Sequence, residues 1–396
     1  MRVANFIAVL ISSALIACGG GSGGGAPGAS SASLISNPSS VNHSSSANNF
    51  SSLATSSVSI MTLEQRVTAV NTTVADNSIC KSIDIFYWQI GDKTGALAAG
   101  WGGRNAPQNP QAETAEGIGP NVPMGVASAS KWVFGAYAMQ RDGYAVLSGG
   151  SIDIGGRSIA RRQFLNFTSG YDQEETPLCL KHTVADCFTG SIANYNPASA
   201  NKFSYNGGHM QAYAVNLGLG EYRDDDGLLN GIFLADEIRR ITNRFSTLTY
   251  DFPSLAGGAN MSPNTYAEFL RAMLNQDLEL GRYLGADPVC AWVDPAITNK
   301  TCDAIATPIS GSSGDINYSA EHWHYSYGHW VEDDPVVGDG AFSSPGAFGF
   351  YPWISADKSL YGIVARKETV IGRPALESVG CGRLIRRAWG SGIAQM

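Results

Sequence analysis

The sequence has few charged residues and no block of basic ones. Asp, Glu, Lys and Arg make up 15% of its 396 residues, and the formal net charge is −8. No stretch interleaves basic with aromatic residues, a pattern that would be typical of a surface that binds nucleic acid. We therefore expect no nucleic-acid partner.

Long hydrophobic runs are also nearly absent. The apolar run over residues 6–16 follows Arg2 and is too short to span a bilayer as a mature helix. This pattern predicts a secretory signal peptide over residues 1–17. No second long apolar run follows, so we expect no membrane-spanning helix.

Residues 15–18, Leu-Ile-Ala-Cys, resemble the bacterial lipobox, in which the cysteine becomes the lipidated N-terminus. The segment that follows, up to residue 60, is rich in Gly, Ser, Ala and Asn and lacks Asp, Glu, Lys and Arg. Such a segment cannot bury a core and is expected to act as a flexible linker, here residues 18–60. The resemblance implies an exported protein anchored through a lipid on Cys18 to the bacterial cell envelope, at the outer membrane or the periplasmic face.

No C-x-x-C pair occurs, which makes a cysteine metal site a poor interpretation. The chain has seven cysteines, and setting Cys18 aside leaves an even number, which in an exported protein argues for disulfides. The spacing favours Cys179–Cys187 and Cys290–Cys302, which leaves Cys80–Cys381. Six cysteines allow fifteen pairings, so these bridges are predictions.

Residues 61–396 have a globular composition and are long enough for one large domain. Strand-like segments stand near both ends, and helical periodicity fills the middle. The expected strands are 83–90, 96–101, 325–331, 347–354 and 360–365, and the expected helices include 63–74, 160–167, 230–245, 265–284 and 374–389. This order predicts an α/β sheet domain with a helical insertion.

No G-x-S-x-G elbow occurs after residue 60, which disfavours an α/β-hydrolase. Instead, Ser128 and Lys131 stand three residues apart at the start of an apolar, helical run that Gly143 ends. That spacing places both side chains on one helix face, and a lysine amine beside a serine hydroxyl can generate a nucleophile without histidine. The same spacing recurs at 78–81, 199–202 and 355–358, so the helical context, and not the spacing alone, selects Ser128.

Further elements follow in a consistent order. Residues 167–170 read Phe-Thr-Ser-Gly, residues 203–208 place Tyr205 before a small polar turn, and residues 344–349 read Ser-Pro-Gly-Ala-Phe-Gly. With the Ser128–Lys131 pair, these elements make the chain over about residues 60–396 resemble the serine β-lactamase and penicillin-binding protein superfamily. The resemblance is nearest to the class C β-lactamase and esterase branch. It implies an antiparallel sheet flanked by helices with a mostly helical subdomain, an acyl-enzyme mechanism and no cofactor.

The resemblance also implies roles for individual residues. Ser128 would be the nucleophile, Lys131 its base and Tyr205 a proton shuttle to the leaving group. The oxyanion hole would consist of the backbone N–H groups of Ser128 and Ala347. The implied substrate-binding residues are Asn206, Gly207, Ser344, Gly346 and Trp330, the last as a wall of the cleft.

Two departures from the family pattern bear on specificity. Asn206 directly follows Tyr205, whereas the second motif usually reads Tyr-x-Asn, so the register Ser204-Tyr205-Asn206 of the Ser-x-Asn branches stays open. Ser344 stands where the third motif normally has a Lys or His that binds a substrate carboxylate, and the following Pro345 has no N–H to donate. We therefore expect neutral esters or amides, as small molecules or peptides, to be better substrates than β-lactams or D-Ala peptides.

Three other functions stay open. The chain could be a β-lactamase or D-Ala peptidase, or a catalytically inactive binding lipoprotein of the same fold, which the altered third motif would permit. It could also be a metal hydrolase, because His322 and His324 stand two apart near Asp333 and Asp334.

Overall fold

The computed structural model describes residues 61–109, 111–173, 183–189, 195–224, 231–292, 302, 304–305, 307–308, 321–368 and 373–396. All of them belong to one compact unit, Met61–Met396. The predicted signal peptide, Cys18 and the linker lie outside the described residues.

The core of this unit is an eight-stranded antiparallel sheet with the order β2-β1-β13-β12-β11-β10-β9-β8. The N-terminal hairpin pairs with the last strand of the chain, with Trp88 opposite Val364. The ends of the sequence therefore meet inside one sheet, as the predicted strands near both ends indicated. The strands are β1 Phe86–Asp92, β2 Ala96–Gly102, β8 Val289–Cys290, β9 His324–Ser326, β10 His329–Glu332, β11 Ala341–Ser343, β12 Tyr351–Ile354 and β13 Leu360–Ala365.

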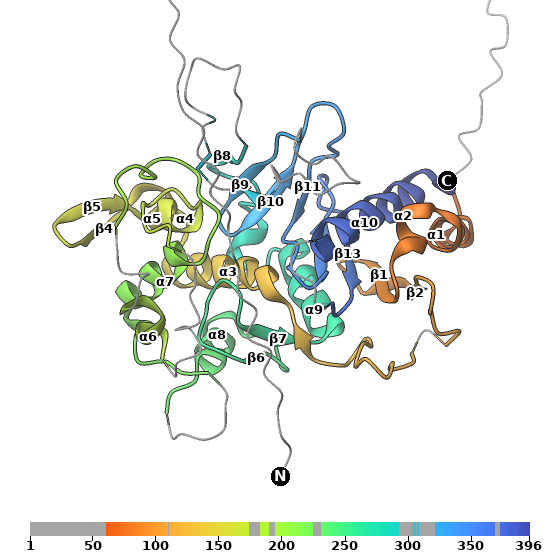
Figure 1. Cartoon of the computed structure of the whole chain (residues 1–396), viewed down its shortest axis with the longest axis horizontal. Coiled ribbons are helices and arrows are strands. Elements are labelled where there is room, and N and C mark those ends of the chain that lie inside the picture. The colour runs from red at the N-terminus through yellow and green to blue at the C-terminus, as the bar shows by residue number, and fades with distance from the viewer. Residues whose placement is uncertain are drawn as a thin grey trace, which may run out of the picture. The chain divides into compact units, whose positions relative to one another are not determined.

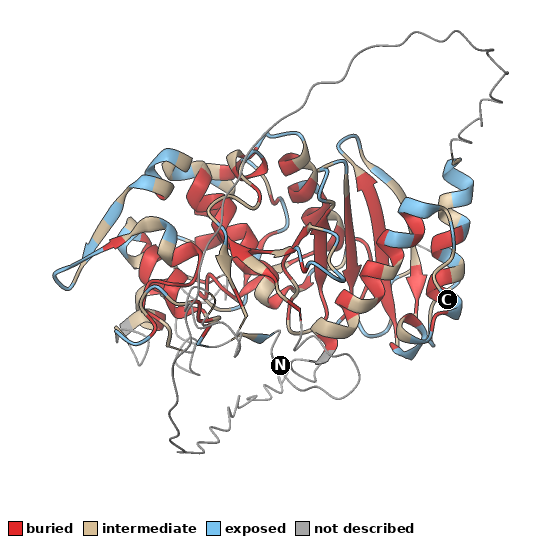
Figure 2. Cartoon of the chain, turned by 90° about the horizontal axis from the view of Figure 1, so that it is seen from above, coloured by how far each residue is buried: buried red, intermediate tan, exposed pale blue. Residues whose placement is uncertain are grey.

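Helices cover both faces of the sheet. Helix α10, Arg373–Ser391, packs against β12 and β13 together with α1, Leu63–Asp76, and α2, Ser78–Ser82 (Figure 1). Helix α9, Pro263–Leu274, packs against β13 and β12 as well. The strands between these helices are largely buried (Figure 2), which explains why they contain near-continuous apolar residues.

The remaining elements form a mostly helical region beside the sheet (Figure 1). The helix α3, Ser130–Asp142, runs between the two parts, and its first ten residues are all buried. The helical region comprises α4 Tyr144–Gly149, α5 Arg161–Leu165, α6 Val184–Thr189, α7 Gly208–Ala214, the π-helical turn Val215–Leu219 and α8 Leu234–Thr242. Two small sheets complete it, one of β4 Ser151–Ile154 and β5 Arg157–Ala160, the other of β3 Met124–Gly125, β6 Thr249–Tyr250 and β7 Ala259–Met261. The expected fold class, an antiparallel sheet with flanking helices and a helical subdomain, is confirmed.

The expected strand 325–331 is wrong in one respect, because it is a hairpin. The chain reverses at Tyr327 and Gly328, which have φ angles of 39° and 85°. A Cβ on Gly328 would lie 2.3 Å from the carbonyl oxygen of Lys131, so only glycine allows the turn to approach α3 this closely. Periodicity does not reveal such a turn, because it is set by contact with a distant helix.

Other boundaries also differ from the expectation. Ala347 lies in the connection before β12 and not in a strand, and the expected helix 265–284 ends at Leu274, before a short 3₁₀ turn at Glu279–Gly281. The expected helix 230–245 is shorter, since α8 begins at Leu234 and Ile232 is half exposed. In each case a turn interrupts a segment whose apolar residues predicted one continuous helix or strand.

Two predicted disulfides are confirmed, Cys80–Cys381 and Cys290–Cys302. The first joins α2 to α10, and the second begins at β8. Cys179 lies outside the described residues, so its pairing with Cys187 stays a prediction. Among the helices of the described residues, none is long and apolar enough to cross a membrane.

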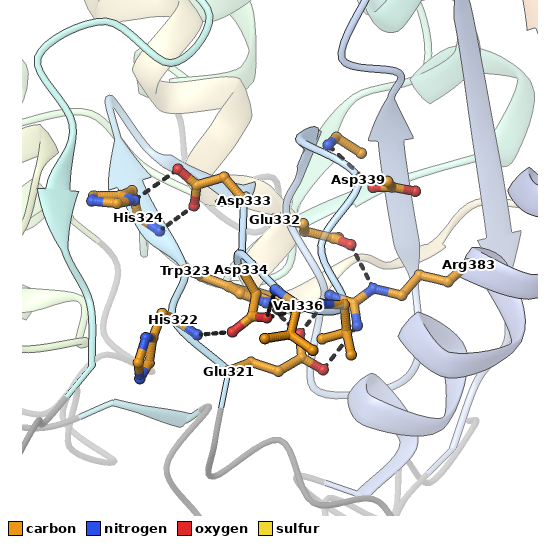
Figure 3. A network of polar contacts seen from close by, with 12 residues as sticks. Glu321, His322, Trp323, His324, Glu332, Asp333, Asp334, Val336, Asp339 and Arg383 are labelled. Atoms are coloured by element: carbon orange, nitrogen blue, oxygen red, sulfur yellow. Dashed lines mark hydrogen bonds and ion pairs between the residues drawn. The ribbon is translucent and has the colours of Figure 1, made fainter.

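A buried ionic network ties the sheet to α10 (Figure 3). Glu332, at the end of β10, has no exposed surface and accepts hydrogen bonds from Arg383 at 2.9 Å and Arg386 at 3.1 Å. The hydroxyl of Tyr351 donates to the same carboxylate at 2.7 Å, and Arg383 also binds Glu321 at 2.8 Å. The network thus fixes the hairpin of β9 and β10 against the C-terminal helix.

Candidate active site

Ser128 lies in a 3₁₀ turn, Ala127–Ala129, that leads directly into α3. Ala127 has a φ of 46°, a conformation that L residues rarely adopt and that costs about 1–2 kcal/mol. The hydroxyl of Ser130 holds this turn, because it donates to the carbonyl of Ala127 at 2.6 Å and accepts from the N–H of Ala259 at 3.1 Å. Ser128 is thus presented by a strained, fixed turn, while Ser130 is fully buried and used in packing.

Lys131 lies next to Ser128 as the spacing predicts. Its Nζ is 3.0 Å from Ser128 Oγ and 2.8 Å from the carbonyl oxygen of Ala256. The lysine side chain is buried, whereas Ser128 is partly exposed. Among the described residues, no carboxylate forms an ion pair with Lys131. The distance to Ser128 suits direct proton transfer.

The serines of the other Ser-x-x-Lys matches have different surroundings. The hydroxyl of Ser355 donates to Asp357 at 2.6 Å, and that of Ser199 donates to the carbonyl of Asn196 at 3.2 Å. Ser78 stands exposed at the start of α2. Context therefore distinguishes Ser128 in the structure, as it does in the sequence.

Tyr205 lies beside the Ser128–Lys131 pair. The Nζ of Lys131 is 4.9 Å from the centroid of its ring, and the ring is partly exposed. Ser204 is buried, and its hydroxyl is 3.4 Å from a carboxylate oxygen of Asp172. Of the two candidates for the second motif, Tyr205 is therefore the one whose side chain lies near Ser128 and Lys131.

Trp330 is not a wall of a cleft. Its side chain is 2% exposed and packs behind Tyr205, with ring centroids 5.1 Å apart. Phe203, Trp323 and Tyr325 surround it further. Because β10 is an interior strand, this large side chain serves as a support for Tyr205 instead of a surface for substrate.

Asn206 and Gly207 also differ from their expected role. The Asn206 amide donates to the carbonyl of Asp172 at 2.6 Å and accepts from the N–H of Gly208 at 3.1 Å, so both of its polar ends bind backbone. Gly207 is the N-cap of α7. These two residues close the turn after Tyr205: the amide of Asn206 is bound to backbone, and Gly207, which stands at the Asn place of the Tyr-x-Asn pattern, has no side chain to bind substrate.

The segment after β11 lies directly against the Ser128 turn. Ser344 is buried, and its hydroxyl donates to the carbonyl of Ser128 at 3.0 Å. A Cβ on Gly346 would lie 2.2 Å from the carbonyl oxygen of Val126, so this approach requires glycine. Ser344 and Gly346 therefore position the segment, and the Ser344 hydroxyl is bound to Ser128 and not placed to bind substrate.

Ala347 follows this close approach and is partly exposed. In the part of the chain that the structure describes, no inter-element backbone hydrogen bond uses the N–H of Ala347 or of Ser128. Two N–H groups without such a bond, near a nucleophile, can stabilise a developing oxyanion.

Arg366, which directly follows β13, is a candidate in the sequence to replace the missing Lys or His of the third motif, but it does not supply a cation to the site. Its side chain is 4% exposed and forms ion pairs of 2.8 Å with Glu368 and with Glu377. Arg366 therefore does not replace the Lys or His of the third motif that binds a substrate carboxylate.

The histidine pair near the end of the sheet has structural contacts (Figure 3). His324 pairs with Asp333 at 2.8 Å, and Asp334 accepts the backbone N–H groups of His322, Val336 and Val337. Within the described ranges, no group of three or more His, Cys, Asp or Glu side chains could hold a metal ion.

Sequence reasoning missed two contributors to the site. The carbonyl of Ala256, which binds Lys131, lies 125 residues away and belongs to no motif. His209 is fully buried between the Phe-Thr-Ser-Gly turn and the Tyr205 loop. A polar residue in a buried helix is the only signal that could have drawn attention to His209.

Comparisons with known proteins give similarity in structure only. No protein-family model matches the chain. No curated protein matches its sequence either.

Among solved structures, a candidate β-lactamase from Bacteroides dorei is 18% identical and has a TM-score of 0.50, with 77% of this chain and 95% of that chain covered. A variant of the simvastatin synthase LovD from Aspergillus terreus is 14% identical, with a TM-score of 0.49 over 85% of this chain and 99% of that chain. A D-stereospecific amidohydrolase from Streptomyces is 14% identical, with a TM-score of 0.47 over 80% of this chain and 99% of that chain.

The similarity to the Bacteroides dorei protein, at 18% identity, is a similarity of fold. The three segments of the resemblance, around Ser128, Tyr205 and Ala347, meet at the start of α3. The chain has the fold of the serine β-lactamase and penicillin-binding protein superfamily.

Proposed function

We propose that the protein is a serine hydrolase that acts through an acyl-enzyme on Ser128. The observation that carries this proposal is the 3.0 Å distance between Lys131 Nζ and Ser128 Oγ in a strained turn at the start of a buried helix. A serine held this close to an amine base, with a phenol beside the amine, is arranged for nucleophilic catalysis.

The mechanism follows from the contacts. Ser128 Oγ attacks the substrate carbonyl carbon as its proton passes to Lys131 Nζ, which the Ala256 carbonyl orients. The oxyanion that forms is stabilised by the N–H groups of Ser128 and Ala347, an interaction of several kcal/mol in the transition state. When the intermediate collapses, the bond to the leaving alcohol or amine breaks, and Tyr205 passes a proton to that group. A water molecule then attacks the acyl carbon as Tyr205 and Lys131 take its proton, the bond from that carbon to Ser128 Oγ breaks, and the proton passes to Oγ as the carboxylic acid leaves.

The polar side chains expected to bind substrate are engaged in other contacts, which limits the class of substrate. Ser344 is bound to the Ser128 carbonyl, Arg366 is neutralised by two glutamates, and the amide of Asn206 is bound to backbone. None of these three side chains is available to bind a substrate carboxylate or amide. We therefore propose neutral esters, or amides without a nearby carboxylate, as substrates in preference to β-lactams and D-Ala peptides.

A matched pair of substrates tests this preference. We expect kcat/KM for p-nitrophenyl butyrate to exceed that for the p-nitrophenyl half-ester of succinate by about tenfold or more, because a charge-assisted partner is worth about 1.5–3 kcal/mol and neither Ser344 nor Arg366 supplies one. The two esters share a leaving group, and each rate is measured against a control without enzyme, because the carboxylate of the succinate half-ester promotes its own hydrolysis. A cephalosporin or the succinate ester turning over faster than the butyrate would contradict the proposal.

The nucleophile is tested by mass spectrometry of the intact protein. After incubation with a fluorophosphonate, the mass is expected to increase by one adduct, and p-nitrophenyl butyrate is expected to be hydrolysed. No adduct and no turnover would favour the alternative of an inactive binding lipoprotein. Rapid, stable labelling by penicillin with little esterase activity would favour the alternative of a D-Ala peptidase.

We also propose that the protein is exported and anchored to the cell envelope through a lipid on Cys18, which the lipobox-like residues 15–18 support. The Cys18→Ser variant is expected to lose incorporated palmitate and to leave the membrane fraction. Enzymatic activity should be retained, because the catalytic unit begins after the linker. A variant that stays fully in the membrane fraction with unchanged palmitate would refute lipidation at Cys18.

A further inference from the structure

His209 occupies a fully buried position on α7, four residues after Tyr205. Its Nδ1 is 2.7 Å from the hydroxyl of Ser169, and its Nε2 is 2.9 Å from the carbonyl oxygen of Ser204. Both ring nitrogens are therefore bound, one to the Phe-Thr-Ser-Gly turn and the other to the residue before Tyr205.

The direction of each hydrogen bond follows from the partners. A carbonyl oxygen only accepts, so Nε2 carries the proton and Nδ1 has a lone pair. The Ser169 hydroxyl must then donate to Nδ1, and its oxygen accepts the N–H of Tyr171 at 3.3 Å. Burial lowers the pKa of His209 from 6.5 to about 3, against the opposing effect of the Ser204 carbonyl, so the ring is neutral at ordinary pH.

The same contacts hold the backbone that carries Tyr205. The Ser204 carbonyl binds His209, and the Ser204 N–H donates to the carbonyl of Phe167 at 2.9 Å. The Phe167 ring stacks on His209 with centroids 5.2 Å apart and meets the Tyr205 ring edge-on at 5.6 Å. Both backbone polar groups of Ser204 are thus fixed by one cluster.

We propose that Ser169 and His209 form a positioning pair that sets the Tyr205 phenol against Lys131, an inference that rests on the proposed function. Neither residue touches the reacting atoms. The Ser169 hydroxyl determines which ring nitrogen of His209 carries the proton and holds the plane of the ring. His209 in turn holds the Ser204 carbonyl, which belongs to the peptide bond that leads into Tyr205. A shift of this loop separates the phenol from Lys131 without moving Ser128, which is held by Ser130 and Ser344 instead.

A double-mutant cycle on the full chain tests the pair. Ser169→Ala leaves Nδ1 of His209 without its donor and is expected to lower kcat by about tenfold or more, with KM nearly unchanged, since small misplacements of catalytic groups have effects of this size. In the Tyr205→Phe background the same substitution should lower kcat less than about twofold, because the group it positions is already absent. Ser169→Thr, which keeps the hydroxyl, should recover most of the loss.

The matched control is Thr242→Val on α8. The Thr242 hydroxyl is also buried and bound to a carbonyl, that of Ile238, but it belongs to a different cluster. This variant should leave kcat unchanged. An equal loss from Ser169→Ala with and without Tyr205→Phe, or no loss at all, would overturn the proposal.

A second measurement separates failure of this inference from failure of the proposed function. Backbone hydrogen exchange of the peptide that contains residues 203–208 needs no turnover. It should become faster in Ser169→Ala and stay as in the parent protein in Thr242→Val. An inactive parent protein would remove the proposed function, while unchanged exchange in Ser169→Ala would refute the positioning pair.

Discussion

Replacing Ser128 by alanine is expected to abolish covalent labelling and ester hydrolysis while leaving the fold intact. The hydroxyl is partly exposed, and among the described residues its hydrogen-bond partner is Lys131. Its removal takes one partner from the lysine amine, which keeps the Ala256 carbonyl. Lys131→Ala should slow acylation by about 10²–10⁴-fold, the usual effect of losing a positioned base. Peptide mapping of the fluorophosphonate adduct and the rate of its formation measure both effects.

Ser130→Ala is the matched control for this assignment. It removes a hydroxyl two residues away that binds Ala127 and Ala259 and faces the interior. Labelling of Ser128 should persist in this variant, although the strained turn is held less firmly. An adduct on any residue other than Ser128 would show that the assignment is wrong.

The Glu332→Gln variant should have the largest effect on stability. It removes the negative charge that faces Arg383 and Arg386 in the interior, and breaking a buried ion pair by removing one partner costs about 3–5 kcal/mol. Denaturant unfolding followed by circular dichroism measures the loss in free energy of unfolding. Asp84→Asn is the control, since the Asp84–Arg104 pair is exposed and 3.5 Å apart, and it should cost no more than about 1 kcal/mol. Equal losses in the two variants would contradict this interpretation of the network.

The same network predicts a sensitivity to acid. Burial by itself would raise the pKa of Glu332, but the charges of Arg383 and Arg386 outweigh burial and bring it to about 2. A carboxyl whose pKa is lower in the folded state stabilises the fold above its unfolded pKa, and this contribution is lost as pH falls toward the folded pKa. Stability should therefore fall between about pH 4.5 and pH 2, and less steeply in Glu332→Gln. Parallel unfolding curves for both proteins across this range would exclude Glu332 as the group responsible.

Local features of the site could be predicted from the sequence. Ser128 and Lys131 lie within one helical turn, so their contact depends only on where the helix begins. The order of the later motifs resembles that of a known family, and this resemblance indicated that Tyr205 and Ala347 lie near Ser128. The roles of Asn206, Trp330 and Ser344 could not be predicted in this way. Each depends on which neighbour its side chain meets, and those neighbours come from distant parts of the chain.

Long-range pairing explains the remaining differences. The hairpin at Tyr327 and Gly328 exists because the turn packs against the backbone of Lys131, a contact across almost two hundred residues of sequence. Arg366 follows a strand near the site, yet its charge is neutralised by Glu377 on α10. Residue type and periodicity predict neither contact, because the two contacts depend on how α3 and α10 are placed on the sheet.

The Cys80–Cys381 disulfide has a mechanical consequence. It joins two cysteines 301 residues apart in sequence, one within α2 and the other within α10. A force that pulls Met61 away from Met396 passes from Cys80 through the covalent bond to α10, without loading the chain between the two cysteines. Tension can then lengthen only the segment before Cys80 and the residues after Cys381, while the turn that holds Ser128 stays unloaded. A protein tethered at its N-terminal side would thus keep its reactive centre folded under strain that unravels its first helix.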